Sequence, residues 1–283
     1  MHVLNNVKLS KHYTVVEKAI RYIEANQLVK LELDDLARAL VMSSIHFQQV
    51  IEQWAGVSPK LLLQYLTLTD AKRRLMLQND VFNVAPVVDL SRTSRLHDLM
   101  VTCVVMTPAE VKALGAGWLV KYGYGPTPYG EALIAWTDQG VCCLAFATDQ
   151  QIDASTHVPH ELTSEWPHAV FELNNMTALN LLDQIFNLAS KISLHLKGTP
   201  FQIQVWQALI HTQPGDIMSY QQLAQHIHHP KASRAVGSAL AANKMAYLIP
   251  CHRVIKESGH VGQYRWLTTR KVAMLSREAV VRI

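Results

Sequence analysis

The chain has 283 residues, of which 49% are hydrophobic and 17% are charged, and its formal net charge is +4. This composition is ordinary for a soluble globular protein, and the length suffices for two or three domains. No apolar stretch reaches the roughly 20 residues of a membrane span, and the N-terminus lacks a basic region followed by an apolar run. The sequence therefore predicts neither a transmembrane segment nor an export signal.

The four cysteines are Cys103, Cys142, Cys143 and Cys251. They show neither CxxC spacing nor a disulfide framework, so a reducing cytoplasm is the expected compartment. Cys142 and Cys143 are adjacent in a predicted strand and point to opposite faces, which favours packing over shared metal binding. We expect no metal site.

The net charge is unevenly distributed along the chain. Residues 1–115 contain 13 Lys and Arg against 11 Asp and Glu, residues 116–197 contain 3 against 8, and residues 198–283 contain 10 against 3. The last segment, at about +7, favours a polyanionic partner, with nucleic acid as the first candidate. The alternative is a generic solvated basic surface.

The first segment contains an internal repeat. Residues 44–51, followed by Ser58-Pro59, recur 49 positions later as residues 93–100, followed by Thr107-Pro108. Ser43 is a predicted helix N-cap, and each Ser/Thr-Pro pair reads as an N-cap followed by the first helical residue. The apolar positions in register are Phe47 and Leu96, Val50 and Leu99, and Ile51 and Met100. Helix, short turn and helix are thus predicted twice, which is a DNA-binding arrangement.

The span from Val15 to Leu114 resembles the tandem helix-turn-helix module of AraC-type transcription activators, whose second helices enter the major groove. The resemblance implies DNA-reading residues Ser44, His46 and Gln48 in the first unit and Arg92, Ser94 and Arg95 in the second. The first reading helix has no Lys or Arg between Val41 and Gln53, so we expect weak phosphate contacts there. The alternative is a helical bundle that has lost DNA binding.

The middle segment reads as a small α/β unit without a catalytic constellation. Residues 122–128 are rich in turn formers and predict a linker. Residues 130–136 and 141–146 read as strands joined by a turn at 137–140. An amphipathic helix is predicted over 177–193, with Thr177 as its N-cap.

The last segment is mainly helical. Helices are predicted over 201–210, 220–226, 232–242 and 267–279, with turns at 213–216 and 250–251. The second and third of these helices, joined through His229-Pro230, form a third helix-turn-helix.

Cys251 is the candidate nucleophile. It lies between Pro250 and His252, with Arg253 one place further on, and cationic neighbours lower the pKa of a thiol. Pro250 restricts Ile249 to extended geometry, which favours a strand end or a sharp turn. The alternative is a buried structural cysteine.

Residues 198–283 resemble the active-site domain of O6-alkylguanine-DNA alkyltransferases. The shared motifs, in order, are 198–202 with 205–206, 219–224, 233–239, 250–253 and 262–266. Residues 130–146 resemble the smaller N-terminal half of the same enzymes. With the tandem helix-turn-helix in front, the whole chain resembles the Ada-type fusion of activator and repair enzyme.

This resemblance implies a multidomain α and α/β protein. We expect an N-terminal tail (1–13), an all-α tandem helix-turn-helix domain (14–115), a small α/β, ribonuclease-H-like domain (116–197) and a mainly α, winged-helix-like active-site domain (198–283). We also expect a monomer in the cytoplasm, associated with the nucleoid.

The resemblance implies catalytic roles for five residues of this chain, as follows. Cys251 attacks the alkyl carbon, His252 accepts the thiol proton through a water, and Glu278 orients His252. Tyr220 protonates the leaving guanine, and Asn243 braces the helix-turn-helix against the active-site turn. The alternative for Glu278 is an exposed carboxylate paired with Arg270, Lys271 or Arg277.

DNA contacts are implied in the same way. Arg234 fills the stack that the flipped guanine vacates, and the small residues Ala235, Gly237, Ser238 and Ala239 permit close approach to the minor groove. Tyr264, Arg265 and Arg253 are assigned to the same DNA-binding surface.

The predicted function is DNA repair by one-shot transfer of an alkyl group from O6 of guanine, with O4 of thymine as a second candidate substrate. The stable thioether product requires no cofactor. The expected partners are alkylated double-stranded DNA, promoter DNA and RNA polymerase. The alternatives are a transcription regulator that senses alkylated DNA and, more remotely, a cysteine hydrolase.

Three departures from the family bear on this reading. Asn243-Lys244 replaces Asn-Pro, which predicts a less rigid hinge. No cysteine precedes Cys103, so the zinc-binding phosphotriester-repair domain of Ada-type activators is expected to be missing. Arg265-Trp266 stands where some relatives have small residues, so O6-benzylguanine is expected to react poorly.

Overall fold

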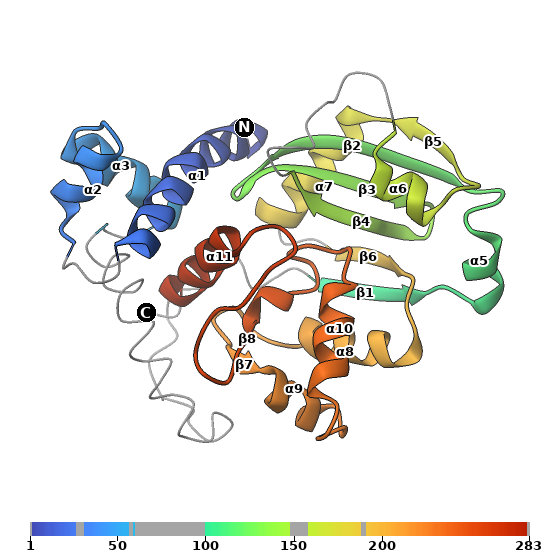
Figure 1. Cartoon of the computed structure of the whole chain (residues 1–283). Helices are drawn as coiled ribbons and strands as arrows, with labels where there is room; N and C mark the ends of the chain where they lie inside the picture. Colours follow the sequence, from blue (N-terminus) through green and yellow to red (C-terminus); the bar gives the residue numbers. More distant parts are fainter. Residues whose placement is uncertain are drawn as a thin grey trace.

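The computed structural model describes residues 2–26, 31–56, 59, 100–147, 158–187 and 191–281. Three N-terminal helices lie beside a mixed six-stranded sheet, and a helical C-terminal part lies along one end of that sheet (Figure 1). The fold is therefore mixed α/β with a large helical share. Within the described residues, no helix has the length and apolar character needed to cross a membrane.

Helix α1 (His2–Ala25) corrects the predicted N-terminal tail, because residues 2–13 are helical. Its buried side chains, Leu9, Tyr13, Val16 and Ile20, recur at helical spacing. They pack α1 against α3, α7, α11 and the strands β2 and β3. The apolar stripe thus begins well before residue 14, and its burial explains why this segment is helical.

The first helix pair consists of α2 (Leu33–Ala39) and α3 (Ser44–Ala55). The Ser43 side chain accepts a hydrogen bond from the backbone N–H of His46 at 3.2 Å, which confirms Ser43 as the N-cap. Phe47, Val50, Ile51 and Trp54 form the buried face of α3. Residues 93–99 of the second copy of the repeat, with Ser94 and Arg95, lie outside the described residues, and so does Arg92, whereas Met100 is strand rather than helix.

Strand β1 (Met100–Val105) corrects the expectation that residues 14–115 are all-α. It pairs in parallel with β6 (Lys191–Leu196), from Met100 opposite Lys191 to Val105 opposite Leu196. Four of its six residues are Val or Thr, which favour the extended backbone. Thr107 then caps α5 (Pro108–Ala113) with Pro108 at the first helical position, as predicted.

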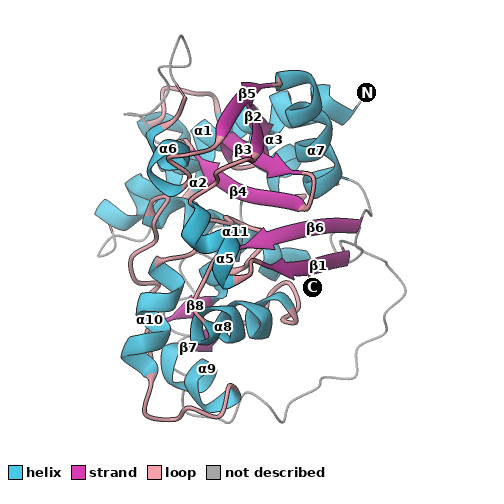
Figure 2. Cartoon of the chain, turned by 90° about the vertical axis from the view of Figure 1, so that its right-hand side faces the viewer, coloured by secondary structure: helices cyan, strands magenta, loops and turns pink. Residues whose placement is uncertain are grey.

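The sheet has the strand order β1-β6-β4-β3-β2-β5. Strands β2 (Leu119–Thr127), β3 (Gly130–Thr137) and β4 (Gly140–Phe146) form an antiparallel meander, and β5 (Val170–Leu173) pairs with β2 in parallel. The two strands predicted over 130–146 are confirmed. Figure 2 shows β1 and β6 continuing the stack of strands toward the C-terminal helices.

Residues 122–127 are strand, not linker, because the glycines in this stretch serve helix packing. A Cβ at Gly123 would lie 2.6 Å from the Cβ of Ala178, and one at Gly125 would lie 2.7 Å from Leu179 Cδ2. Helix α7 (Asn175–Asn187) can therefore lie close on β2. The helix predicted over 177–193 is correspondingly shorter, since 191–193 belong to β6, and Asn174 rather than Thr177 caps it by accepting from the Thr177 N–H at 3.0 Å.

The helices predicted in the last segment are confirmed. They are α8 (Pro200–Ile210), α9 (Tyr220–His226), α10 (Ser233–Ala241) and α11 (Thr268–Val281). Capping boxes begin two of them: Thr199 with Gln202 in α8 and Ser219 with Gln222 in α9. A parallel pair of two-residue strands, β7 (Met218–Ser219) and β8 (Val254–Ile255), joins the start of α9 to the segment that follows Cys251. Helix α6 (His160–Glu165) precedes β5.

Candidate active site

Cys251 begins a single turn of 3-10 helix, η1 (Cys251–Arg253), directly after Pro250. The predicted sharp turn at this cysteine is thereby confirmed. The side chain is buried with 6% of its surface exposed. Strand β8 follows at once and pairs with β7, so η1 is tied to the start of α9.

Asn243, at the end of α10, fastens the turn that contains Cys251. Its side-chain amide donates to the carbonyl of Ile249 at 3.1 Å, to that of Met245 at 3.3 Å and to Cys251 Sγ at 3.2 Å. Its Oδ1 accepts from the Met245 N–H at 2.8 Å. Asn243 is itself buried, so each of these bonds is shielded from water.

The backbone that follows Asn243 is hydrogen-bonded to strand β4. The Leu144 N–H donates to the carbonyl of Lys244 at 3.0 Å, and the Ala246 N–H donates back to the carbonyl of Leu144 at 2.8 Å. These two bonds form a bridge to strand β4. Lys244 therefore lies in a segment whose backbone pairs with Leu144, and the expectation of a less rigid hinge stays a prediction.

Glu278 of α11 is the centre of a buried polar cluster. Its Oε1 lies 2.9 Å from His252 Nε2, and Arg253 donates to both of its oxygens at 2.9 Å. The Gly215 N–H adds a bond to Oε2 at 3.1 Å. Only 3% of Glu278 is exposed, so the alternative of an exposed surface carboxylate is wrong.

Arg253 lies inside this cluster, which corrects its assignment to the DNA-binding surface. Besides Glu278, its guanidinium binds the carbonyl of Thr212 at 2.7 Å and the hydroxyl of Thr212 at 2.8 Å. The side chain is buried. A planar, bidentate donor next to a buried carboxylate explains why the arginine of this motif turns inward.

The electrostatics of the cluster fix the protonation of His252. Burial by itself would raise the pKa of Glu278, but the charges of and hydrogen bonds from His252 and Arg253 lower that pKa to about 2. Burial lowers the pKa of His252 despite the neighbouring carboxylate. At neutral pH we infer an ionised Glu278, paired with Arg253, that accepts from Nε2–H of a neutral imidazole; the imidazole is charged only in acid. The other nitrogen, Nδ1, is then a bare acceptor, and it is buried without a hydrogen-bond partner among the described side chains and backbone.

Cys251 is a thiol rather than a ready thiolate. Burial raises its pKa, and neither the hydrogen bond from Asn243 nor the charge of Lys271 offsets that effect. Cationic neighbours do lower this pKa as expected, through the charges of Lys271 and Arg265, but burial outweighs them and the net pKa is raised. Such a thiol needs a base that removes its proton during the reaction.

Two tyrosines flank the cysteine. Tyr220, the first residue of α9, and Tyr264 are both half-buried. Burial raises the pKa of each phenol, and the nearby Cys251 raises it further. The phenols therefore stay protonated and can donate hydrogen bonds. The Tyr220 ring lies 3.7 Å from a Cβ placed at Gly237, so the α10 glycine permits its position.

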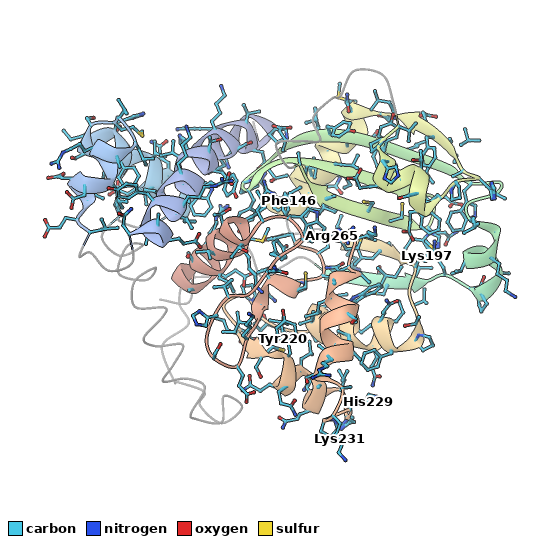
Figure 3. The ribbon with its side chains drawn as sticks, viewed as in Figure 1. Phe146, Lys197, Tyr220, His229, Lys231 and Arg265 are labelled. Atoms are coloured by element: carbon cyan, nitrogen blue, oxygen red, sulfur yellow. The ribbon has the colours of Figure 1, made fainter. Side chains whose placement is uncertain are left out.

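The exposed face of α10 carries Arg234, Ala235 and Ser238, while Gly237 is half-buried. Val236, Ala239 and Leu240 are buried on the opposite face, so Ala239 belongs to the core rather than to the small-residue surface. Arg265 is exposed and donates to the carbonyl of Ala241 at 2.9 Å. Figure 3 shows Tyr220 and Arg265 at different heights along this part of the molecule, with His229 and Lys231 at its lower tip.

In the N-terminal pair, His46 and Gln48 are exposed on α3. The Gln48 amide donates to Glu52 at 2.9 Å, and the Ser44 hydroxyl donates to Asp34. No cluster of three or more metal-ligating side chains occurs in the described part of the chain.

Sequence reasoning missed one neighbour of the catalytic candidates. The Tyr247 ring is stacked parallel to the His252 ring, with centroids 6.4 Å apart and an interplanar angle of 7°. No motif marks Tyr247, because its contacts with Tyr129 and Phe186 come from distant parts of the chain.

Comparison with known proteins identifies relatives of this chain. Residues 200–280 match the family described as 6-O-methylguanine DNA methyltransferase, DNA binding domain. The chain is 34% identical over 163 residues to the constitutive methylated-DNA–protein-cysteine methyltransferase of Bacillus subtilis, covering 56% of this chain and 95% of that protein. The crystal structure of Mycobacterium tuberculosis OGT in complex with DNA covers 56% of this chain and 92% of its own, with 29% identity and a TM-score of 0.45.

The most extensive of these similarities spans almost the whole chain. The bifunctional transcriptional activator/DNA repair enzyme Ada of Escherichia coli is 32% identical over 273 residues, which cover 93% of this chain and 74% of that protein. The regulatory protein ada of Salmonella typhimurium is likewise 32% identical, over 266 residues. The chain therefore belongs to the Ada-type family of bifunctional transcriptional activators and DNA repair enzymes.

Proposed function

We propose that this protein is a methylated-DNA–protein-cysteine methyltransferase that moves one alkyl group from O6 of guanine in DNA to Cys251. The observation that carries the proposal is the arrangement around the buried thiol. Cys251 is followed directly by His252, whose Nε2 is held by an ionised Glu278 and whose Nδ1 is a bare acceptor. An in-line displacement by sulfur requires a thiolate, and a neutral imidazole next to a buried thiol can generate it by removing the thiol proton.

The reaction begins with the alkylated guanine leaving the duplex, since its O6 is inaccessible in the stack. Flipping costs a few kcal/mol. Arg234 fills the vacated space from the exposed face of α10, and the small side chains of Ala235, Gly237 and Ser238 allow that helix to approach the minor groove. Tyr264 and Arg265 belong to the same DNA-contacting surface.

Transfer then forms one bond and breaks one. His252 takes the thiol proton at Nδ1 through an intervening water, and Glu278 stabilises the resulting imidazolium. The sulfur of Cys251 bonds to the alkyl carbon while the carbon–oxygen bond breaks, and the electron pair goes to guanine O6. Tyr220 donates a proton to the departing guanine, so the step leaves a Tyr220 phenolate and a His252 imidazolium with no change in net charge, and Asn243 keeps the cysteine turn in place. The thioether is stable, so each molecule reacts once, and no cofactor takes part.

The N-terminal helices serve a regulatory role within the same chain. Helices α1, α2 and α3 correspond to the start of an AraC-like module with α2 and α3 as its first helix-turn-helix, in which Ser44, His46 and Gln48 face promoter DNA. Residues 116–197 correspond to the ribonuclease-H-like half of the alkyltransferase and residues 198–283 to its winged-helix-like half. The partners are alkylated duplex DNA, promoter DNA and RNA polymerase. The protein acts as a monomer in the cytoplasm, associated with the nucleoid. Its substrate is O6-alkylguanine, with O4-methylthymine as a second substrate.

Intact-protein mass after incubation with an O6-methylguanine duplex tests the proposal, followed by peptide mapping. A gain of one methyl group per chain, located on Cys251, is the expected result. An unchanged mass despite DNA binding would favour a regulator that only senses alkylated DNA. Repeated turnover on acyl substrates would favour a cysteine hydrolase.

Arg234→Ala is expected to slow methyl transfer from duplex DNA by at least about tenfold, because the flipped state loses the side chain that replaces the guanine. Single-turnover rates on an O6-methylguanine duplex measure the effect. The free base O6-methylguanine is the control, since it needs no flipping, and its rate should be unchanged. Equal losses on both substrates would contradict this role.

O6-benzylguanine is expected to react at least about tenfold more slowly than O6-methylguanine presented as a free base. Trp266 is 4% exposed and packs edge-to-face on Tyr264, with centroids 5.2 Å apart, and on Phe146 at 6.3 Å. This packing cannot open for a benzyl ring without overpacking strain of about 1–3 kcal/mol. The rate of reaction with O6-benzylguanine is measured as the loss of methyltransferase activity with time at a fixed concentration of that compound. Rapid inactivation by low micromolar O6-benzylguanine would contradict the expected selectivity.

A further inference from the structure

The N-terminal helices are built into the repair part of the molecule. Helix α1 lies beside α11 (Figure 1). From α3, Trp54 reaches the turn between β2 and β3, where its indole N–H donates to the carbonyl of Pro128 at 2.7 Å. Trp54 is only 1% exposed, and its ring meets that of Tyr129 edge-on, with centroids 6.1 Å apart. The aromatic contact and the buried hydrogen bond fix α3 to the sheet.

Helix α11 connects this contact to the active site through consecutive residues. The Arg277 guanidinium lies over the rings of both Trp54, at 5.6 Å, and Tyr129, at 5.7 Å. The next residue is Glu278, which holds His252 at 2.9 Å. Two turns earlier, Arg270 lies over the Tyr13 ring at 5.4 Å and donates to the carbonyl of Tyr129 at 3.0 Å. The rotation of α11, and with it the position of the Glu278 carboxylate, therefore depends on partners in the N-terminal helices.

A second set of contacts approaches His252 from its other side. The Tyr129 ring lies 5.9 Å from the Tyr247 ring, which is stacked on the His252 imidazole. Tyr247 has a φ of 65°, a left-handed backbone conformation that costs a side-chain-bearing residue about 1 kcal/mol or more. The close Phe186 ring, at 4.6 Å, holds it there. Strained residues kept in place by surrounding packing concentrate at functional sites.

We infer that Trp54 is a positioning residue for alkyl transfer. Through Arg277 on one side and Tyr129 with Tyr247 on the other, it holds Glu278 and His252 in the geometry that lets His252 take the thiol proton. Helix α3, which carries the proposed DNA-reading residues, thereby affects the rate of chemistry at Cys251. This inference rests on the proposed function, because it concerns the rate of that reaction.

The decisive experiment compares Trp54→Ala with Phe47→Ala in the full chain. Phe47 is also a buried aromatic residue of α3, about two turns away, so its removal loosens the N-terminal helices without removing the ring that contacts Tyr129 and Arg277. Single-turnover transfer from an O6-methylguanine duplex should slow about tenfold in Trp54→Ala, since small misplacements of a reacting group cost one to two orders of magnitude. Phe47→Ala should transfer the methyl group at close to the wild-type rate. Trp54→Phe, which keeps an aromatic ring at this position, should transfer at most of the wild-type rate.

The pH profile separates positioning from loss of stability. His252 faces Glu278, Arg253 and Lys271, and it must be neutral to accept the proton. If Trp54→Ala lets water reach the cluster, the burial that depresses the pKa of His252 is relieved, and the acid limb of the rate profile moves to higher pH. Affinity for the alkylated duplex, measured in a Cys251→Ala background, should not change.

Two further readouts keep the inference falsifiable. Arg277→Gln should slow transfer as Trp54→Ala does, and the double variant should be no slower than either one, because both disrupt one contact set. Additive losses, or equal slowing by Phe47→Ala, would overturn the inference. The pKa of His252, measured by NMR, reports the environment of the imidazole and requires no alkyl transfer. If the wild-type protein transfers no methyl group, the proposed function is wrong. The NMR comparison of wild type and Trp54→Ala then still tests whether Trp54 positions His252.

Discussion

Cys251→Ala should abolish methyl transfer and leave a folded protein that still binds alkylated DNA. The sulfur is the only atom of this residue that takes part in the displacement, and neither His252 nor Asn243 can replace it as acceptor of the alkyl group. Structurally the loss is small, because the Asn243 amide keeps the carbonyls of Ile249 and Met245 as acceptors at 3.1 and 3.3 Å. We expect a destabilisation of about 1 kcal/mol from one lost buried sulfur.

Two measurements check this expectation together. Intact mass after incubation with an O6-methylguanine duplex should be unchanged, while the gel-shift affinity for that duplex stays within a factor of a few of the wild type. Cys103→Ala is the matched control, since Cys103 lies in β1 and should have no part in transfer. Methylated protein from the Cys251→Ala variant would show that the nucleophile is another residue.

Glu278→Gln should have the largest effect on stability. The substitution preserves shape but leaves the Arg253 guanidinium, which is 7% exposed, without its counter-charge. Breaking a buried ion pair by neutralising one partner costs about 3–5 kcal/mol. Transfer should also slow by about 10- to 100-fold, part of the effect of a general base, because His252 loses the carboxylate that holds it and stabilises its charged form.

The acid sensitivity of folding follows from the same carboxylate. The pKa of Glu278 is about 2 in the folded protein against an ordinary value of 4.5. Because the folded pKa is depressed, its stabilisation is fully present above about pH 4.5 and disappears as the pH falls toward 2. The amount lost is on the order of 3 kcal/mol, and Glu278→Gln should lack this loss.

Urea unfolding at pH 7, 4 and 3 tests both statements. The wild type should lose stability across the acid window, and the variant, already weaker at pH 7, should lose less. Glu257→Gln removes an exposed carboxylate from the same basic segment and is the matched control. Equal unfolding midpoints for Glu278→Gln and the wild type at pH 7 would contradict the buried ion pair.

Features set by neighbouring residues could be predicted from the sequence. The Ser43 and Thr107 caps, the helices of the last segment and the turn at Cys251 depend on side chains within about four positions of each other. The motif at 250–253 supplied the candidate nucleophile and base, and the family resemblance added the orienting carboxylate Glu278. The structure brings His252 and Glu278 together at 2.9 Å.

Features set by distant partners could not be predicted in the same way. Strand β1 exists because β6, some 90 positions later, offers it an edge. The Gly123 and Gly125 pattern reads as a turn until α7 is known to lie on it. Arg253 reads as a DNA contact because nothing in the sequence says that Glu278 and Thr212 enclose it. In each case the deciding partner lies far away in the sequence, where periodicity and propensity carry no information.

The burial of Cys251 also affects which reagents can consume its single reactive thiol. Oxidation by peroxide and capture by electrophiles in solution both proceed through the thiolate, and their rates follow its exposure. A thiol that is 6% exposed and has a raised pKa presents little thiolate to such reagents. Each molecule reacts only once, so a sulfur that is inert toward reagents in solution stays available for an alkylated guanine that is flipped out of DNA. Chemical stress on the cell therefore does not consume the repair capacity before the protein reaches damaged DNA.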